Sequence, residues 1–424
     1  MLSFAEAKER ITHLPLPLQT ERLPLWQANG RTLALDLYAK QDLPAWSNSA
    51  MDGYVFRQED ILNATPETPV CLPLSGTIQA GDTRVHTIAP HTCMRIFTGA
   101  PVPQNGNLVI MQENVALTKD GIAIHQCPKL WNNIRQKGEE AKSGALLLRK
   151  GSTLDAAAIG LALSASVHEV TVWKVPNIGI LSTGDELKDP RQGGTLETGQ
   201  IWATNSINLQ MAFQSLGMNT IDCGIAKDTL QSTTETFIHA IETQQCDMLV
   251  STGGVSVGDF DVVHKALNDL PGYRVEMNFW KVRMKPGKPV AIGVIYTPTK
   301  EIPLFALPGN PVSALMGFYQ FVQPFVFQKM GMSNPELPTQ WVTLGEDFTK
   351  RGSRLEFVRV WLQETSTETL AFSTGNQSSA WMSSLADASA LLPFPADQTR
   401  LAKGTKLQVQ RLPGLSKWPA TWRT

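Results

Sequence analysis

Two aspartates, Asp259 and Asp261, follow a glycine turn at a point where the sequence could bind an anion. Met248 to Ser251 is a short apolar run that predicts a buried strand, and Gly253 and Gly254 then break it. The unpaired N–H groups of a strand–turn–helix junction attract anions. Carboxylates beside such a site need a cation between them and the ligand. The segment therefore predicts a phosphate or another oxyanion held together with a divalent metal.

Three lysines in one proline- and glycine-rich turn supply positive charge for such a site. They are Lys281, Lys285 and Lys288. A solvated charge run is the alternative interpretation, but lysine is a common phosphate ligand. Carboxylates for a metal, with lysines and backbone amides for oxyanions, indicate phosphoryl or nucleotidyl chemistry. No Ser/His/Asp arrangement has a recognisable spacing, and the chain has only seven histidines, which disfavours a hydrolytic triad and a histidine metal cluster.

From residue 176 onward the sequence alternates between strand and helix patterns. Strands are predicted at 177–181, 218–223 and 248–251, and helices at 204–216 and 229–243, while 304–327 repeats strand, turn and apolar helix. This alternation predicts a parallel sheet covered on both faces. Ligands bind at the carboxyl ends of the strands in such sheets. The turns 182–187, 251–261 and 307–313 are therefore expected to converge on one crevice.

The flanking segments have other patterns. Residues 1–11 form an amphipathic helix pattern, and a second helix is predicted at 156–166 with Asp155 or Thr153 as its cap. Residues 66–137 carry short β-rich runs between prolines and glycines, which predicts a small β domain. After Pro335 the pattern is all β and predicts a small sandwich or barrel.

Length and composition limit the classes of function. A chain of 424 residues suggests roughly three domains. Thirty-seven basic residues balance 38 acidic ones, so no global field favours nucleic acid or an anionic membrane. No apolar run reaches the roughly 18 residues of a membrane span. Five scattered cysteines without a CxxC pair argue against a disulfide framework or a zinc site and favour a reducing cytoplasm.

Several motifs together resemble one family. In order and spacing, the chain is similar to the molybdopterin molybdenumtransferases of the bacterial MoeA type and to the E domain of gephyrin. The resemblance runs from about residue 5 to the C-terminus. It rests on NSAMDGY (48–54), FTGAPVP (97–103), GEE (138–140), LSTGDEL (181–187), STGGVSVGDFD (251–261), MKPGKP (284–289), LPGNPVSA (307–314) and NQSSAWMSSLADASAL (376–391).

The resemblance implies an α/β plus β fold in an elongated multidomain homodimer. A linker and dimerisation domain is expected at 1–44 and 142–174, interrupted by an inserted β domain at 45–141. A molybdopterin-binding α/β domain with a parallel sheet is expected at 175–330 and a C-terminal β barrel at 331–424.

The resemblance also implies a reaction. The family takes adenylylated molybdopterin and molybdate, removes the adenylyl group in a step that depends on a divalent metal such as Mg²⁺, and leaves molybdenum on the dithiolene of the pterin. The sulfur ligands then belong to the substrate. Transient contact with the molybdopterin adenylyltransferase, which supplies the substrate, is expected.

Residues that match the family's motifs are expected to carry this chemistry. The acids Glu186, Asp228 and Asp261 are expected to be catalytic and to hold the metal, while Asp52 and Thr98 act from the partner protomer. The residues expected to bind substrate are Gly253, Gly254, Ser256, Lys281, Lys285, Lys288, Pro308, Gly309, Asn310, Pro311 and Ser313.

Two departures from the family pattern affect the expected contacts. Glu140 stands where many relatives have aspartate, and Ser378 where glycine is common. The first lengthens an acid by one methylene, and the second restricts a loop. The two alternatives to an insertase are a molybdopterin adenylyltransferase, which shares the α/β domain, and a scaffold that binds the cofactor without turnover.

Overall fold

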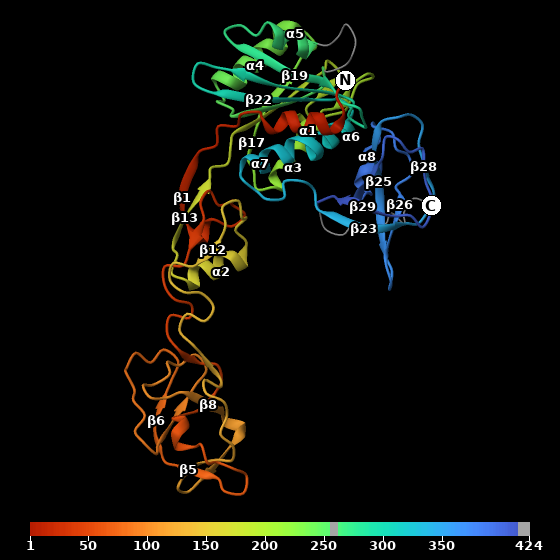
Figure 1. The fold of residues 1–424 in the computed structure, drawn as a ribbon. Coiled ribbons are helices and arrows are strands. Elements are labelled where there is room, and N and C mark those ends of the chain that lie inside the picture. The colour runs from red at the N-terminus through yellow and green to blue at the C-terminus, as the bar shows by residue number, and fades with distance from the viewer. Residues whose placement is uncertain (255–261, 414–424) are drawn as a thin grey trace. The chain divides into compact units, whose positions relative to one another are not determined.

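The computed structural model describes residues 1–254 and 262–413, except for the side chains of Phe279 and Trp280. The chain divides into two compact units (Figure 1). One comprises Met1–Glu21 with Trp173–Thr424, and the other comprises Arg22–Val172. In the part described, no helix combines the length and the apolar character that crossing a membrane requires.

A six-stranded sheet organises the first unit. Its order is β17 (Thr220–Ala226), β14 (Ile178–Thr183), β18 (Met248–Thr252), β22 (Glu301–Leu307), β21 (Pro289–Tyr296) and β19 (Arg274–Lys281). The first four strands are parallel, as predicted. The other two strands, β21 and β19, pair antiparallel and add an edge that the sequence pattern did not predict. No helix separates β19, β21 and β22 along the chain, and a parallel pair needs such a crossover.

Helices cover both faces of this sheet (Figure 1). Alternate residues of each strand point to opposite faces, so Met248 and Val250 pack in one apolar cluster and Leu249 in another. The first cluster is covered by α1 (Phe4–Thr12), α3 (Thr204–Gln214), α6 (Pro311–Gly317), the π-helical turn Phe318–Val322 and α7 (Gln323–Lys329). The second is covered by α4 (Leu230–Glu242) and α5 (Val262–Asn268).

The predicted C-terminal β domain is a barrel. The strands β25 (Leu355–Glu364), β26 (Thr369–Ser373), β23 (Thr339–Leu344), β29 (Lys406–Arg411) and β27 (Ala390–Phe394) follow one another. The pairing of β27 with β25 closes the ring. β20 (Met284–Lys285) pairs with β25 from outside the ring and so joins the lysine-rich turn to the barrel. The remaining short elements are β24 (Phe348–Thr349), β28 (Arg400–Leu401) and α8 (Met382–Ala386).

The second unit consists of short strands around three apolar clusters. Two clusters draw on residues between Tyr54 and Ile134, and the third on residues between Leu25 and Leu37 and between Leu154 and Val172. The predicted helix is α2 (Ala156–Ser164), and Asp155 caps it by accepting a hydrogen bond from the N–H of Ala158. The domain boundaries stay a prediction.

Its strands form small sheets. These are β6 (Leu74–Ile78), β7 (Cys93–Ile96), β4 (Gly53–Phe56) and β8 (Leu108–Met111); β5 (Val70–Leu72), β10 (Gly121–Ile124) and β9 (Val115–Thr118); β3 (Asn48–Ser49) with β11 (Ile134–Arg135); β2 (Leu37–Tyr38) with β12 (Leu146–Leu148); and β1 (Thr20–Pro24) with β13 (Glu169–Trp173).

Candidate functional site

A cavity of about 890 Å³ lies at the carboxyl ends of β14, β18 and β22, and we call it the central cavity. This is the edge at which open α/β sheets bind ligands, and the volume suits a small organic molecule. The described parts of all three predicted turns reach it, so their convergence is confirmed. Its lining includes Thr183, Glu186, Asp228, Thr252, Gly253, Gly254, Pro308, Gly309, Asn310 and Pro311.

The glycine turn after β18 packs tightly against its neighbours. Gly253 has φ of 88° and its N–H donates to the carbonyl of Leu307 at 3.2 Å. A Cβ on Gly253 would lie 2.4 Å from the carbonyl oxygen of Thr183. A Cβ on Gly309 would lie 3.6 Å from the Cα of Gly253. Glycine is required at residue 253 because the backbone conformation is left-handed and there is no space for a side chain.

Two of the three predicted metal-binding acids line the central cavity. Glu186 and Asp228 follow β14 and β17, and both are exposed. Their loops are joined because the N–H of Asp228 donates to Asp185 Oδ1 at 3.1 Å and the N–H of Asp185 donates to Asp228 Oδ2 at 3.4 Å. The third acid, Asp261, and the predicted ligand Ser256 lie outside the described residues.

The exposed donors of the central cavity are oxygen atoms, which suit a hard divalent cation. Among the described residues, neither Glu186 nor Asp228 forms an ion pair with a basic side chain, and no three metal-ligating residues cluster. Thr183 Oγ1 is buried at the cavity wall and has no hydrogen-bond partner within the described chain. Carboxylates and hydroxyls are the ligand types that Mg²⁺ accepts, and Mg²⁺ commonly uses one or two protein carboxylates together with phosphate. The residues present therefore fit such an ion.

A second cavity of about 590 Å³ adjoins the first, and we call it the basic pocket. Lys285, Lys288 and Arg354 line it. It shares Pro289, Pro308 and Asn310 with the central cavity, and Ser313, Ser378 and Ser379 add hydroxyl groups. Lys281, which was also predicted to bind substrate, lines neither cavity. Its backbone carbonyl accepts a hydrogen bond from the N–H of Leu2.

Charges around the basic pocket are only partly balanced. Lys285 Nζ lies 2.8 Å from Glu356 Oε1, and Glu356 is buried. Arg359 is fully buried beside this pair, and burial lowers the pKa of its guanidinium to about 10. Its Nη2 donates to the carbonyl of Ser378 and its Nε to Ser384 Oγ. Arg359 Nη1 has no hydrogen-bond partner within the described chain, so the neighbouring Glu356 carboxylate compensates the buried guanidinium only in part.

The loop that carries Ser378 and Ser379 is fixed to both domains around the pocket. The side chain of Gln377 accepts the N–H of Arg359 at 2.9 Å and donates to the Arg359 carbonyl at 3.1 Å. On the other side, the N–H of Val312 in α6 donates to the carbonyl of Ser379 at 3.1 Å. The barrel therefore supplies one wall of the basic pocket and the α/β domain supplies the other.

Asp52 and Thr98 lie in the second unit and are brought together there. Asp52 Oδ1 accepts hydrogen bonds from both the N–H and the Oγ1 of Thr98, each at 2.7 Å. These donors, first the backbone N–H and then the hydroxyl, hold the pKa of the Asp52 carboxyl below its usual range. The carboxylate is thus ionised and exposed on its own unit.

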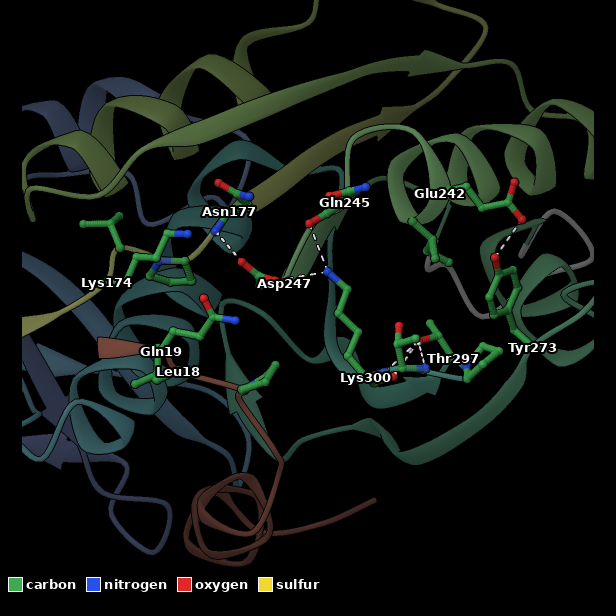
Figure 2. A pocket seen from close by; sticks show the side chains of 16 residues that line it. Leu18, Gln19, Lys174, Asn177, Glu242, Gln245, Asp247, Tyr273, Thr297 and Lys300 are labelled. Atoms are coloured by element: carbon green, nitrogen blue, oxygen red, sulfur yellow. Dashed lines mark hydrogen bonds and ion pairs between the residues drawn. The ribbon is translucent and has the colours of Figure 1, made fainter. Parts of the chain in front are cut away.

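A third cavity, of about 620 Å³, lies at the amino ends of the same parallel strands (Figure 2). Two of its charged groups are paired within the protein, because Lys300 Nζ contacts Asp247 Oδ1 at 3.1 Å and the carbonyl of Gln245 at 3.0 Å. Asp247 Oδ2 accepts the N–H of Asn177 at 3.0 Å. These contacts tie together the starts of β14, β18 and β22, so we interpret the cluster as structural.

Three residues of the site were not predicted from the motifs. Arg354 contributes a guanidinium to the basic pocket, and Trp202 contributes an indole ring to the central cavity. Asn205 Nδ2, at the start of α3, donates to the carbonyl of Gly309 at 2.7 Å and positions the turn after β22. Arg354 and Trp202 belong to none of the motifs, and the motif LPGNPVSA gave no indication of Asn205 as a partner.

Three family models match the chain, over residues 2–166 (MoeA N-terminal region, domain I and II), 179–328 (probable molybdopterin binding domain) and 342–412 (MoeA C-terminal region, domain IV). A molybdopterin molybdenumtransferase from Haemophilus influenzae is 36% identical over 362 residues, covering 85% of each chain. The chain belongs to the molybdopterin molybdenumtransferase family. Molybdopterin molybdenumtransferase 2 from Mycobacterium tuberculosis is 34% identical over 412 residues, covering 96% of this chain and 99% of the relative.

The fold supports the same assignment. The crystal structure of the molybdopterin biosynthesis MoeA protein from Pyrococcus horikoshii OT3 superposes with a TM-score of 0.81 at 26% identity. It covers 97% of this chain and all of the other. The resemblance and the fold class predicted from the motifs are therefore confirmed.

Proposed function

We propose that this protein inserts molybdenum from molybdate into adenylylated molybdopterin, with release of AMP, in the biosynthesis of the molybdenum cofactor. One observation carries the proposal within this family. A cavity large enough for an organic phosphate and lined by Glu186 and Asp228 adjoins a pocket lined by Lys285, Lys288 and Arg354. The first suits the adenylylated substrate, and the second suits an oxyanion.

The residues of the chain divide the work between binding and positioning. Lys288 and Arg354 attract molybdate electrostatically, while Glu356 fixes the ammonium group of Lys285 at the same pocket. The glycine turn after β18 lets the substrate approach the backbone, and the first turn of α3 presents a positive dipole end to phosphate. Pro289, Pro308 and Asn310 line both cavities, which keeps the two reactants close to each other.

Glu186 and Asp228, with Asp261, are proposed to hold Mg²⁺, which when bound neutralises phosphate charge during release of the adenylyl group. The acids themselves keep the cavity negative in the absence of metal. Metal dependence therefore forms part of the proposal.

We further propose that the protein is a homodimer. Exposed apolar side chains gather on the elements around one cluster of the second unit, and Tyr38 and Leu146 face each other on paired strands. The set is Trp26 at 63%, Leu35 at 59%, Tyr38 at 51%, Leu146 at 39% and Leu163 at 37% exposure. Apolar residues exposed together mark interaction sites. Sedimentation should show a dimer that Trp26→Glu weakens and that Trp341→Glu, on the barrel, leaves intact.

In a dimer, Asp52 and Thr98 are proposed to act at the site of the other protomer. Mixing inactive Asp52→Ala and Asp228→Ala proteins should then restore part of the activity after subunit exchange. The five cysteines are all free thiols, which supports a reducing cytoplasm. Substrate is proposed to come from the molybdopterin adenylyltransferase through transient contact.

Turnover of the purified protein tests this function. With adenylylated molybdopterin, molybdate and Mg²⁺, we expect stoichiometric release of AMP that stops when the metal is chelated. An adenylyltransferase would instead form adenylylated molybdopterin from ATP and molybdopterin, and a scaffold would bind the substrate without releasing AMP. Either result would overturn the proposal.

A further inference from the structure

One wall of the central cavity is apolar, opposite in character to the acids and glycines described above. Its side chains come from the short strands β15 (Leu187–Lys188) and β16 (Ile201–Trp202), from the loop between these strands, and from α8. They are Leu187, Leu196, Ile201, Trp202 and Met382. Oxyanion chemistry does not use such side chains, so this wall needs another ligand group.

Trp202 is the one aromatic side chain among the described residues that line the central cavity. β16 pairs with β15 in parallel, and Trp202 lies directly beside Lys188. Lys188 Nζ stands 5.9 Å from the centre of the indole ring and is held by the carbonyl of Thr195 at 2.9 Å. Lys188 does not line the cavity, so this cation supports the ring from outside it.

The volume of the cavity leaves room for a ring on this wall. At about 890 Å³ it exceeds what a tetrahedral oxyanion needs and lies in the range of pockets that bind drug-sized ligands. Purine and pteridine rings combine a π face with polar edges, and aromatic side chains bind such rings by stacking. The polar atoms of the adjoining wall, Thr204 and Asn205 at the start of α3, can meet polar edges.

We propose that Trp202 is a specificity-determining residue whose indole stacks on a purine-like heteroaromatic ring of the substrate. This inference rests on the proposed function, since adenylylated molybdopterin carries two such rings, adenine and the pterin. The apolar wall then binds the ring, and the phosphate groups extend toward the glycine turn and the acids.

Binding measurements separate the two rings and do not depend on turnover. Calorimetry with AMP reports on adenine, and calorimetry with metal-free molybdopterin reports on the pterin. Trp202→Leu keeps apolar volume but removes the π face, so it should weaken one of these ligands roughly ten-fold. Trp202→Phe should retain most of the affinity. Trp341→Leu is the matched control, because Trp341 is 66% exposed on the barrel and lines no part of the central cavity.

The outcomes distinguish this inference from the proposed function. A loss for AMP alone assigns adenine to the indole, and a loss for molybdopterin alone assigns the pterin. The inference is overturned if Trp202→Leu binds both ligands as tightly as wild type, or if wild type binds neither. If wild type binds a ring through Trp202 but never releases AMP from the adenylylated substrate, the proposed function fails and the stacking role stands.

Discussion

Replacing Gly253 with alanine should destabilise the protein and disturb the central cavity more than the same replacement at an exposed glycine. The residue has φ of 88°, and a left-handed conformation costs an L-residue about 1–2 kcal/mol. The new Cβ would also lie 2.4 Å from the carbonyl oxygen of Thr183. The backbone at residue 253 and the carbonyl of Thr183 are both packed beside the sheet, so removing this clash requires the backbone to move. That movement costs about 1–3 kcal/mol more. The free energy of unfolding should therefore fall by about 2–5 kcal/mol.

Gly272→Ala separates the two contributions. Gly272 has φ of 82°, but a Cβ there would meet no atom within 4 Å. The free energy of unfolding of Gly272→Ala should therefore fall by only about 1–2 kcal/mol, the cost of the left-handed conformation. Urea unfolding of wild type, Gly253→Ala and Gly272→Ala measures the change in the free energy of unfolding of each variant.

Activity gives an independent readout of the same change. A displacement of about 1 Å at the glycine turn can lower the rate about 10²-fold. AMP release by Gly253→Ala should fall on that scale at temperatures where the protein is folded, whereas Gly272→Ala should turn over like wild type. Equal stability and equal activity of the two variants would refute the close-packing argument.

Three more substitutions test the acids, the basic pocket and the second unit. Asp228→Asn should lower the rate of AMP release at least about 10²-fold, because it removes a carboxylate proposed to hold the metal. Lys288→Met should raise the molybdate concentration for half-maximal rate about ten-fold, since it removes a cation that lines the basic pocket. Thr98→Val should raise the pKa of Asp52, measured by NMR titration, because the hydroxyl donor is lost while the backbone N–H remains. In wild type, the lowered pKa of Asp52 adds to the free energy of unfolding as pH rises through the acid range. This gain should be smaller in Thr98→Val.

Matched controls make these results specific. Asp269→Asn and Lys119→Met change exposed charges that line neither the central cavity nor the basic pocket, and both variants should behave like wild type. Loss of activity in either control would point to a general charge effect. An unchanged pKa of Asp52 in Thr98→Val would show that the hydroxyl does not hold the carboxylate.

The parallel part of the fold was predictable because each strand ends in a turn with its own chemistry. STGDEL, STGGVSVGDFD and LPGNPVS all follow buried strands, so their meeting at one edge follows from the topology. The antiparallel edge was not predictable in the same way. Residues 289–296 are buried on both sides, and the absence of a helix between them and β22 was the one signal of an antiparallel pair.

The acids and the glycine turn were identified from motifs, but the basic pocket depends on long-range contacts. Lys285 belongs to a motif, whereas its partner Glu356 lies on a barrel strand 71 residues later. Arg354 approaches the same pocket because β20 pairs with β25. Trp202 lines the central cavity because β15 and β16 pair across a loop. Tertiary pairing of this kind has no local pattern in the sequence.

Transfer of molybdenum to the dithiolene is the central claim, and reconstitution of an apo-molybdoenzyme measures it most directly. Purified protein is incubated with adenylylated molybdopterin, molybdate and Mg²⁺, and the product is given to an apoenzyme that is active only with molybdenum cofactor. The proposed function predicts activation that requires the protein and molybdate together, with molybdenum recovered in the apoenzyme at one atom per cofactor. Release of AMP without any molybdate-dependent activation would contradict it.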